Sequence, residues 1–218
     1  MHLAAAICDH RVMADDEAGD DRALWDDAAA TFDAAPDHGL HDAVARRAWT
    51  ALLRDLLQEV LQEGRPVMIA DLGCGTATLT ALLAHDGHRV VGVDFSPQML
   101  RIARAKTAGI VPEPTFVEAD VQDPPLPPGS FDVVLSRHVL WATADPSSAV
   151  RNWHHLLRPG GLLLLIEGRW STGAGLTAAE SAALVEPLGG RTELRPLDDP
   201  ALWGGPITDE RYVLLHTR

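Results

Sequence analysis

The chain has few cysteines, an excess of acidic over basic residues and no long apolar run. Cys8 and Cys74 are its only cysteines among 218 residues, one in an expected tail and one in a Gly-rich loop. We therefore expect no disulfide framework and a reducing compartment, the cytoplasm. The 18 Lys and Arg residues against 31 Asp and Glu residues give a formal net charge of −13, which disfavours nucleic acid as a partner. No apolar run approaches the length of a membrane span, so we expect no membrane partner either.

The N-terminal part is predicted to be a tail followed by two helices. Residues 1–20 are rich in Ala and Asp without a sustained apolar period, which is typical of a disordered tail. Apolar residues recur at helical spacing over 22–32 and again over 40–63, and Pro36–Gly39 breaks the pattern between them. We divide the single domain into a tail (1–20), an N-terminal helical lid (21–64) and a core (65–218).

After residue 65, short apolar runs alternate with helical segments, which is typical of a parallel sheet covered by helices on both faces. The expected strands are 67–71, 89–93, 115–117, 131–135, 162–167, 192–197 and 212–217. The expected helices between them are 77–85, 97–106 and 146–157. This pattern predicts an α/β fold with a doubly wound, mostly parallel, seven-stranded sheet. Right-handed crossovers should place the turns that follow the parallel strands along one edge.

A Gly-rich turn follows the first expected strand. Gly73 and Gly75 lie two residues apart, which lets backbone amides approach a ligand closely. A dinucleotide-binding fingerprint would have a third glycine where Thr78 stands. Asp71, at the tip of the strand, would repel a pyrophosphate but would suit an ammonium group. The turn therefore favours a cationic ligand over a nicotinamide dinucleotide.

Two further acids follow the next strands. Asp94 ends the second strand, where a carboxylate can accept hydrogen bonds from both hydroxyls of a ribose, and Asp120 follows the third strand. The acids could also merely cap helices, and Asp123 offers a substitute for Asp120 in the same loop. A Gly pair with acids at three successive strand tips is nevertheless a specific pattern for a nucleoside ligand with a cationic group.

With these residues, the sequence resembles the class I S-adenosylmethionine-dependent methyltransferases of the small-molecule type, over about residues 67–167. The matching stretches are, in order, Asp71-Leu72-Gly73-Cys74-Gly75-Thr76, Val93-Asp94-Phe95-Ser96, Glu118-Ala119-Asp120-Val121, Phe131-Asp132-Val133-Val134 and Leu157-Arg158-Pro159-Gly160-Gly161. Ala77 replaces the family's third glycine. The resemblance implies a Rossmann-like methyltransferase fold, S-adenosylmethionine as cofactor and S-adenosylhomocysteine as product.

The resemblance also implies which residues bind the cofactor. Asp71 and Gly73 would face the methionyl part, Asp94 the ribose, and Asp120 with the Val121 amide the adenine edge. The full set of expected cofactor-binding residues is Asp71, Gly73, Cys74, Gly75, Asp94, Phe95, Met99, Asp120, Val121 and Ser136.

The acceptor side is expected after the fourth strand, where His138 and Arg137 are the candidate catalytic residues. Methyl transfer from a sulfonium is an in-line displacement that depends mainly on alignment and on exclusion of water. His138 could accept a proton from a hydroxyl or amine, or it could be a histidine at a helix start that bonds to backbone. Arg137 could hold a carboxylate or phosphate of the acceptor, or it could pair with Asp132 or Asp145.

Four tryptophans are candidates for the substrate pocket: Trp25, Trp141, Trp170 and Trp203. Core packing is the alternative for Trp141 and Trp170 and the favoured interpretation for Trp25. Ser136 and Arg137 stand where a metal-dependent catechol methyltransferase would have carboxylates, so we expect no metal.

The sequence thus predicts S-adenosylmethionine-dependent methyl transfer to an oxygen or nitrogen atom of a small molecule enclosed by the lid. Two alternatives remain open. One is a nicotinamide-dependent oxidoreductase, and the other is a catalytically silent S-adenosylmethionine-binding subunit of a methyltransferase complex.

Overall fold

The structure, a computed structural model, describes residues 18–58, 60 and 65–218, so the expected tail lies almost wholly outside the described residues. The helices are α2 (Ala18–Phe32), α3 (Pro36–Gly39), α4 (Ala43–Leu57), α5 (Thr78–His85), α6 (Pro97–Thr107), α7 (Pro146–Leu156), α8 (Ala178–Val185) and α9 (Pro200–Trp203), with 3-10 turns η1 (Leu140–Ala142) and η2 (Glu186–Leu188). The strands are β1 (Met68–Leu72), β2 (Arg89–Asp94), β3 (Thr115–Glu118), β4 (Phe131–Arg137), β5 (Leu157–Arg169), β6 (Arg191–Pro196) and β7 (Glu210–Thr217).

The seven strands form one sheet in the order β3-β2-β1-β4-β5-β7-β6. The first five strands are parallel, and β7 runs antiparallel between β5 and β6. The predicted fold class is therefore confirmed. Because β7 runs in the opposite direction, its first residues lie beside the last residues of β5, as the pairing of Arg211 with Gly168 shows. The carboxyl ends of β1, β2 and β4 and the start of β7 share one edge of the sheet, called here the carboxyl edge.

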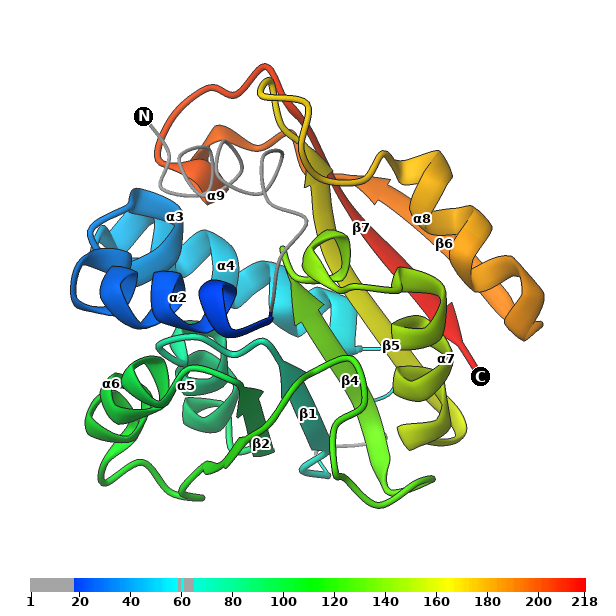
Figure 1. Cartoon of the computed structure of the whole chain (residues 1–218), viewed down its shortest axis with the longest axis horizontal. Coiled ribbons are helices and arrows are strands. Elements are labelled where there is room, and N and C mark those ends of the chain that lie inside the picture. Colours follow the sequence, from blue (N-terminus) through cyan, green and yellow to red (C-terminus); the bar gives the residue numbers. More distant parts are fainter. Residues whose placement is uncertain (1–17, 59, 61–64) are drawn as a thin grey trace.

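Helices cover both faces of the sheet (Figure 1). On one face, α4 and α5 contribute Trp49, Leu53 and Leu79 to a core cluster with β1, β4 and β5, and on the other, α7 packs Trp153 against the same strands. Residues 162–166 of β5 are each at most 1% exposed. A strand covered on both faces needs an unbroken apolar run, which is why β5 could be predicted from its leucines alone.

Side-chain caps fix the helix starts that position the carboxyl edge. Ser96 caps α6 by accepting a hydrogen bond from the Met99 amide, with Pro97 in the first turn, and Asp145 caps α7 ahead of Pro146 in the same way. Asp42 caps α4, so this helix begins at Ala43 and not at Leu40 as expected. The expected helix end at 63 falls on residues outside the described part.

Three short helices differ from the expectation. Pro36–Gly39, expected as a break, is the helical turn α3, and the Pro/Gly-rich loop 198–209 contains α9 capped by Asp199. The unexpected α8 starts with a capping box of Thr177 and Glu180, a signature that the sequence does contain. In the part of the chain that the structure describes, no helix is both long enough and apolar enough to cross a bilayer.

Candidate cofactor and acceptor site

The turn after β1 depends on glycine. Gly73 and Gly75 have φ angles of +74° and +52°, and a Cβ atom on Gly73 would lie 2.3 Å from a methyl group of Val139. The amides of Gly73 and Cys74 both donate to the carbonyl of Val93, at 2.8 and 3.0 Å. Ala77, in place of the family's third glycine, also adopts a positive φ of +64° and stands at the first position before α5, where it makes no side-chain cap. The two hydrogen bonds to Val93 thus hold the turn close to the tip of β2. The positive φ angles of the turn are unfavourable for most residues other than glycine.

Asp94, at the tip of β2, faces this turn. Its carboxylate accepts hydrogen bonds from the Gly75 amide through Oδ2 and from the Ser96 amide through Oδ1, both at 2.9 Å. Asp94 is only 7% exposed, and this burial raises its pKa to about 6. The sequence predicts this residue for the ribose, and in the structure its carboxylate lies against the Gly-rich turn.

Asp71, at the tip of β1, is also buried. It is 3% exposed and accepts a hydrogen bond from the Thr80 hydroxyl at 2.5 Å. Burial raises the pKa of Asp71 to about 6, while the Thr80 hydrogen bond and the charge of Arg137 act in the opposite direction. The sequence analysis did not single out Thr80. A hydroxyl on the apolar inner face of α5 is the signal that could have found it.

Helix α2 lies across the tips of β2 and β3. Asp26 accepts hydrogen bonds from the Ser96 hydroxyl at 2.5 Å and from the Gln98 amide at 3.2 Å. Arg22 donates from Nε to the Phe95 carbonyl at 2.8 Å and pairs with Glu118 at the same distance. These polar contacts join α2 to the segment predicted to hold the ribose.

A second set of contacts joins the end of α2 to the Gly-rich turn. Asp33 pairs with Lys106 at 2.8 Å and accepts a hydrogen bond from the Thr76 hydroxyl at 2.6 Å. The Phe32 ring reaches Gly75, where it would lie 3.5 Å from an added Cβ atom. Helix α2 therefore covers the predicted cofactor loops directly.

The remaining predicted cofactor residues differ in accessibility. Cys74 is half-buried, and burial raises the pKa of its thiol. Asp120 is exposed and accepts a hydrogen bond from the Gln122 amide at 2.8 Å. Met99 and Ser136 have buried side chains, and the Ser136 hydroxyl donates to the Leu72 carbonyl at 3.2 Å. These two side chains support the carboxyl edge from inside. The carbonyl of Val121 accepts from the Trp153 indole at 2.6 Å.

Arg137, the last residue of β4, pairs with neither of its two expected partners. Its guanidinium lies 3.3 Å from Asp37 of α3 and 4.3 Å above the ring of Trp49. Asp132 instead faces the opposite edge of the sheet, where it pairs with Arg65 and Arg158, and Asp145 caps α7. The partner of Arg137 could not be predicted because it lies 100 positions away in an expected break.

His138 follows β4 in a left-handed conformation, with φ of +58°. Its amide donates to the Ile166 carbonyl at 2.9 Å, and its ring centroid lies 5.2 Å from that of Trp170 and 6.0 Å from that of Trp203. The backbone contact agrees with the structural alternative, while the ring lies among aromatic side chains of the carboxyl edge as the catalytic interpretation requires.

Glu167 fixes the segment after His138. It accepts hydrogen bonds through Oε1 from the Val139 and Leu140 amides, at 3.1 and 2.9 Å. Burial raises the pKa of this fully buried residue to about 8. Glu167 was not predicted as a site residue, because a single acid at the end of an apolar run has no distinctive spacing.

Three of the four tryptophans predicted for the acceptor pocket gather near His138. Trp141 and Trp170 have ring centroids 5.4 Å apart, and the ring of Trp203 lies 6.0 Å from that of His138. Trp25 is separate, since it lies on α2 with its ring 6.1 Å from that of Phe32.

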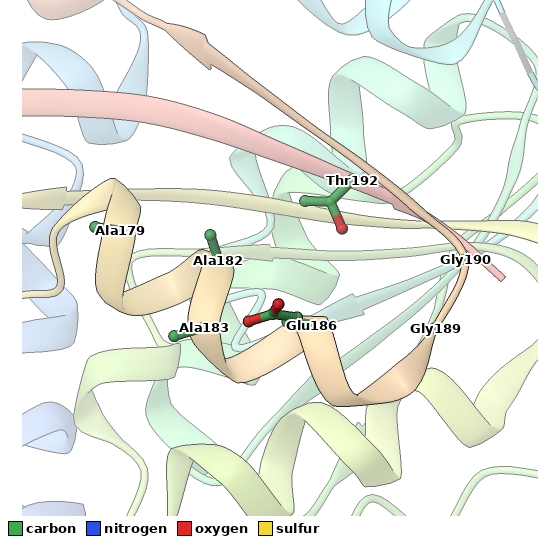
Figure 2. A pocket seen from close by; sticks show the side chains of 7 residues that line it. All are labelled: Ala179, Ala182, Ala183, Glu186, Gly189, Gly190 and Thr192. Carbon is green, nitrogen blue, oxygen red and sulfur yellow. The ribbon is translucent and has the colours of Figure 1, made fainter.

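A hollow elsewhere on the molecule has a different character. Figure 2 shows it between α8 and β6, lined by Ala179, Ala182, Ala183, Glu186, Gly189, Gly190 and Thr192. These residues are far along the sheet from β1 and β2, and Glu186 is the only charged one. Within residues 18–58, 60 and 65–218, no three His, Cys, Asp or Glu side chains are grouped to hold a metal ion.

Comparisons with known proteins agree with the predicted family. Residues 70–165 match a family described as "Methyltransferase domain". The chain is similar to the demethylmenaquinone methyltransferase of Thermus thermophilus, with 39% identity over 48% of this chain and 49% of that protein. It is also similar to the ubiquinone/menaquinone biosynthesis C-methyltransferase UbiE of Shewanella oneidensis, with 36% identity over 47% of this chain and 43% of that protein. The chain thus spans about half the length of the curated relatives it matches.

A solved structure shows the same fold with the cofactor in place. The magnesium protoporphyrin IX methyltransferase ChlM of Synechocystis PCC 6803, solved with bound S-adenosylmethionine, superposes with a TM-score of 0.63 at 18% identity, over 80% of each chain. The matched segment 70–165 contains Asp71, the Gly-rich turn, Asp94 and His138. This segment therefore matches the methyltransferase-domain family that its sequence motifs predicted.

Proposed function

We propose that the chain transfers a methyl group from S-adenosylmethionine to an oxygen or nitrogen atom of a small molecule. The observation that carries the proposal is the pair of buried carboxylates, Asp71 and Asp94, at neighbouring strand tips beside the Gly-rich turn. Asp71 would bind the ammonium group of the cofactor, and Asp94 would accept hydrogen bonds from the ribose hydroxyls. A neutral or anionic ligand would not supply a cationic group to pair with the buried Asp71.

The remaining proposed cofactor contacts involve the Gly-rich turn and the segments that follow β2 and β3. Gly73, Cys74 and Gly75 would offer backbone atoms to the methionyl part, and Phe95 would lie beside the ribose. Asp120 and the Val121 amide would bind the adenine edge. Met99 and Ser136 would act through the packing that holds these loops in place.

The acceptor would bind where the tips of β4 and β5 meet the lid. When bound, S-adenosylmethionine supplies a sulfonium methyl group that a nucleophile takes by in-line displacement. His138 would accept the proton of the acceptor hydroxyl or amine, and Glu167 would hold the loop that carries His138. Trp141, Trp170 and Trp203 would exclude water from the acceptor.

We propose that only part of the predicted lid moves. Helices α2 and α3 cover the carboxyl edge, so they would open for ligand exchange. Helix α4 buries Trp49, Leu53, Leu56 and Leu57 against the sheet, so it would belong to the core. Enclosure by α2 and α3 suits a small acceptor. The negative net charge of the chain disfavours nucleic acid as the acceptor.

Carbon is the second candidate for the attacking atom, because the similar protein of Shewanella oneidensis is named a C-methyltransferase. The test uses S-adenosylmethionine with a ¹³C-labelled methyl group, offered with demethylmenaquinone in one arm and a panel of small phenols and amines in another. The ¹³C chemical shift of the product identifies the atom that is methylated. We expect an O-methyl or N-methyl product. A C-methylated quinone as the only product would overturn the choice of oxygen or nitrogen.

A further inference from the structure

Two guanidinium groups are buried side by side at the acceptor end of the carboxyl edge. The side chain of Arg137 is 10% exposed and that of Arg211 is 2% exposed. Arg137 ends β4 and Arg211 lies near the start of the antiparallel β7, so the two side chains arrive from opposite strand directions. Their Cζ atoms lie 5.9 and 5.4 Å from the ring centre of the same residue, Trp203.

The hydrogen-bonding capacity of this pair is only partly used. Arg137 pairs with Asp37 at 3.3 Å, and Arg211 pairs with Asp209 at 3.1 Å. Both guanidinium Nε atoms are buried and have no hydrogen-bond partner among the residues that the structure describes. In that part of the chain, Oδ1 of Asp37 also lacks a partner. An unused buried donor costs free energy, and an arginine fork binds a carboxylate or phosphate best when two of its N–H groups are engaged.

We propose that Arg137 and Arg211 form a binding site for an anionic group of the acceptor, a carboxylate or a phosphate, and that Asp37 occupies this site in the closed chain. This inference rests on the proposed function, because it names the class of acceptor for the same edge. Burial lowers the pKa of Arg137 and of Arg211, and the charge of Asp37 opposes that shift in both. Asp37 therefore acts on both cations, as an acceptor anion would.

The placement of Asp37 makes exchange with a ligand feasible. It lies on α3, a single helical turn in which it is the only buried residue. Pro36 of the same turn packs on α9, close enough that a Cβ atom on Gly204 would lie 2.5 Å from it. Withdrawal of α3 would therefore uncover the Arg137 guanidinium and the end of α9 at Gly204. An acceptor that brings its own anion replaces the lost charge, whereas a neutral acceptor leaves two buried cations undercompensated.

The aromatic rings around the two guanidinium groups indicate that the anionic group belongs to a planar acceptor. Trp170 lies 5.1 Å from the Arg211 guanidinium, and Trp203 lies beside both guanidinium groups. Tryptophan faces that stack on arginine also stack on planar apolar groups. We therefore expect an aromatic carboxylate or an aryl phosphate to be bound better than an aliphatic anion.

The test measures binding of three probes by calorimetry in the presence of S-adenosylhomocysteine: benzoate, phenyl phosphate and the uncharged benzamide. In D37N, which keeps the shape of Asp37 and removes its charge, we expect benzoate or phenyl phosphate to bind at least about tenfold more tightly than benzamide, as for hydrogen bonds to charged groups. We also expect the preferred anion to bind D37N more tightly than the unmodified chain. The tighter of the two anions identifies carboxylate or phosphate as the natural group. In R211Q the preference for anions should disappear, and in R211K it should persist in part.

The matched control is D33N, which removes another lid carboxylate that pairs with Lys106 and not with the arginines. D33N should not raise anion affinity. Equal affinity of D37N for benzoate and benzamide, or a preference that survives in R137Q and R211Q, would overturn the proposal. Thermal melts show whether the arginine variants fold, and D37N tests the idea if they do not. If the chain binds S-adenosylhomocysteine but shows no preference for anions, only the anion site is ruled out. If the unmodified chain does not bind S-adenosylhomocysteine, the proposed function is ruled out.

Discussion

Asp71 and Asp94 are carboxyl groups that the fold keeps buried at a cost in stability. Their pKa values, about 6, lie above the ordinary value of 3.8 for aspartate. A folded state that holds protons more tightly than the unfolded state loses stability as the pH rises through this window, here from about 4 to 6. At neutral pH both groups are mainly ionised and weaken the fold. Such residues are typical of functional sites, where a ligand supplies the missing compensation.

This charge state predicts how cofactor binding depends on pH. Affinity for S-adenosylhomocysteine should be constant near pH 8 and should fall as the pH is lowered through 6, because a protonated Asp71 no longer attracts the ligand ammonium. The loss approaches about tenfold per pH unit for each carboxylate that must be ionised. Calorimetry from pH 8 to pH 5 measures it, and D71N is the control, with weaker binding and a flatter profile. Undiminished affinity of the unmodified chain at pH 5 would be incompatible with this role.

His138 offers a second prediction. If it is the general base, His138→Ala should lower turnover by roughly 10² to 10⁴, the usual contribution of positioned proton transfer. Cofactor affinity should hardly change, because its proposed contacts come from β1, β2 and β3. A structural histidine would instead lower the melting temperature and cofactor binding together. Turnover measured against pH separates these cases, and a variant that matches the unmodified chain at every pH removes His138 from the mechanism.

Helices α2 and α4 are attached to the molecule in different ways. Among the described side chains of α2 only Ala29 is buried, and the helix is held by ion pairs and hydrogen bonds such as those of Asp26 and Asp33. Helix α4 buries Trp49 and three leucines in the core. Elements with few buried apolar contacts open at low free-energy cost. We therefore expect α2 and α3 to open while α4 stays in place.

Removal of residues 1–38 tests this difference. The shortened chain keeps α4, so it should fold and bind S-adenosylhomocysteine, but it should transfer methyl groups poorly because water reaches the acceptor. The measurement compares turnover, cofactor affinity and melting temperature with those of the full chain. Full activity of the shortened chain on the same acceptor would show that the two helices are not a lid, and failure to fold would assign them to the scaffold.

Some helices and strands could be predicted from the sequence and others could not, for physical reasons. Strand β5 was predictable from its unbroken apolar run, and α6 from apolar residues that recur at helical spacing. Helix α9 was missed because four residues contain no period, and α8 because its alanines give little contrast between faces. Capping by Asp42 and Asp199 decided helix starts that periodicity alone places poorly.

Across the molecule, the topology explains which site residues could be predicted. Parallel strands bring their carboxyl ends together, so Asp71, Asp94 and Arg137 were expected at one edge and lie there. The contacts of Arg137 with Asp37 and of Ser96 with Asp26 join segments 70 or more positions apart. Tertiary packing alone determines such pairs, and no local spacing in the sequence indicates them.

The two sides of the carboxyl edge carry different buried groups. The β1 and β2 side carries Asp71 and Asp94, and the β4 and β7 side carries Arg137 and Arg211, which pair with Asp37 and Asp209. A cationic cofactor end and an anionic acceptor would thus be drawn to different parts of one edge. This arrangement fits methyl transfer between two bound molecules.

Calorimetric titration of the intact chain with S-adenosylhomocysteine and, separately, with NADH shows which of the two ligands the site binds. We expect saturable binding of S-adenosylhomocysteine and none of NADH, and a loss of about 1.5 to 3 kcal/mol in Asp94→Ala, as expected for hydrogen bonds to a charged partner. The melting temperature of the variant shows that its fold survives. Tight binding of NADH alone, or equal affinity of the folded Asp94→Ala protein for S-adenosylhomocysteine, would contradict the account.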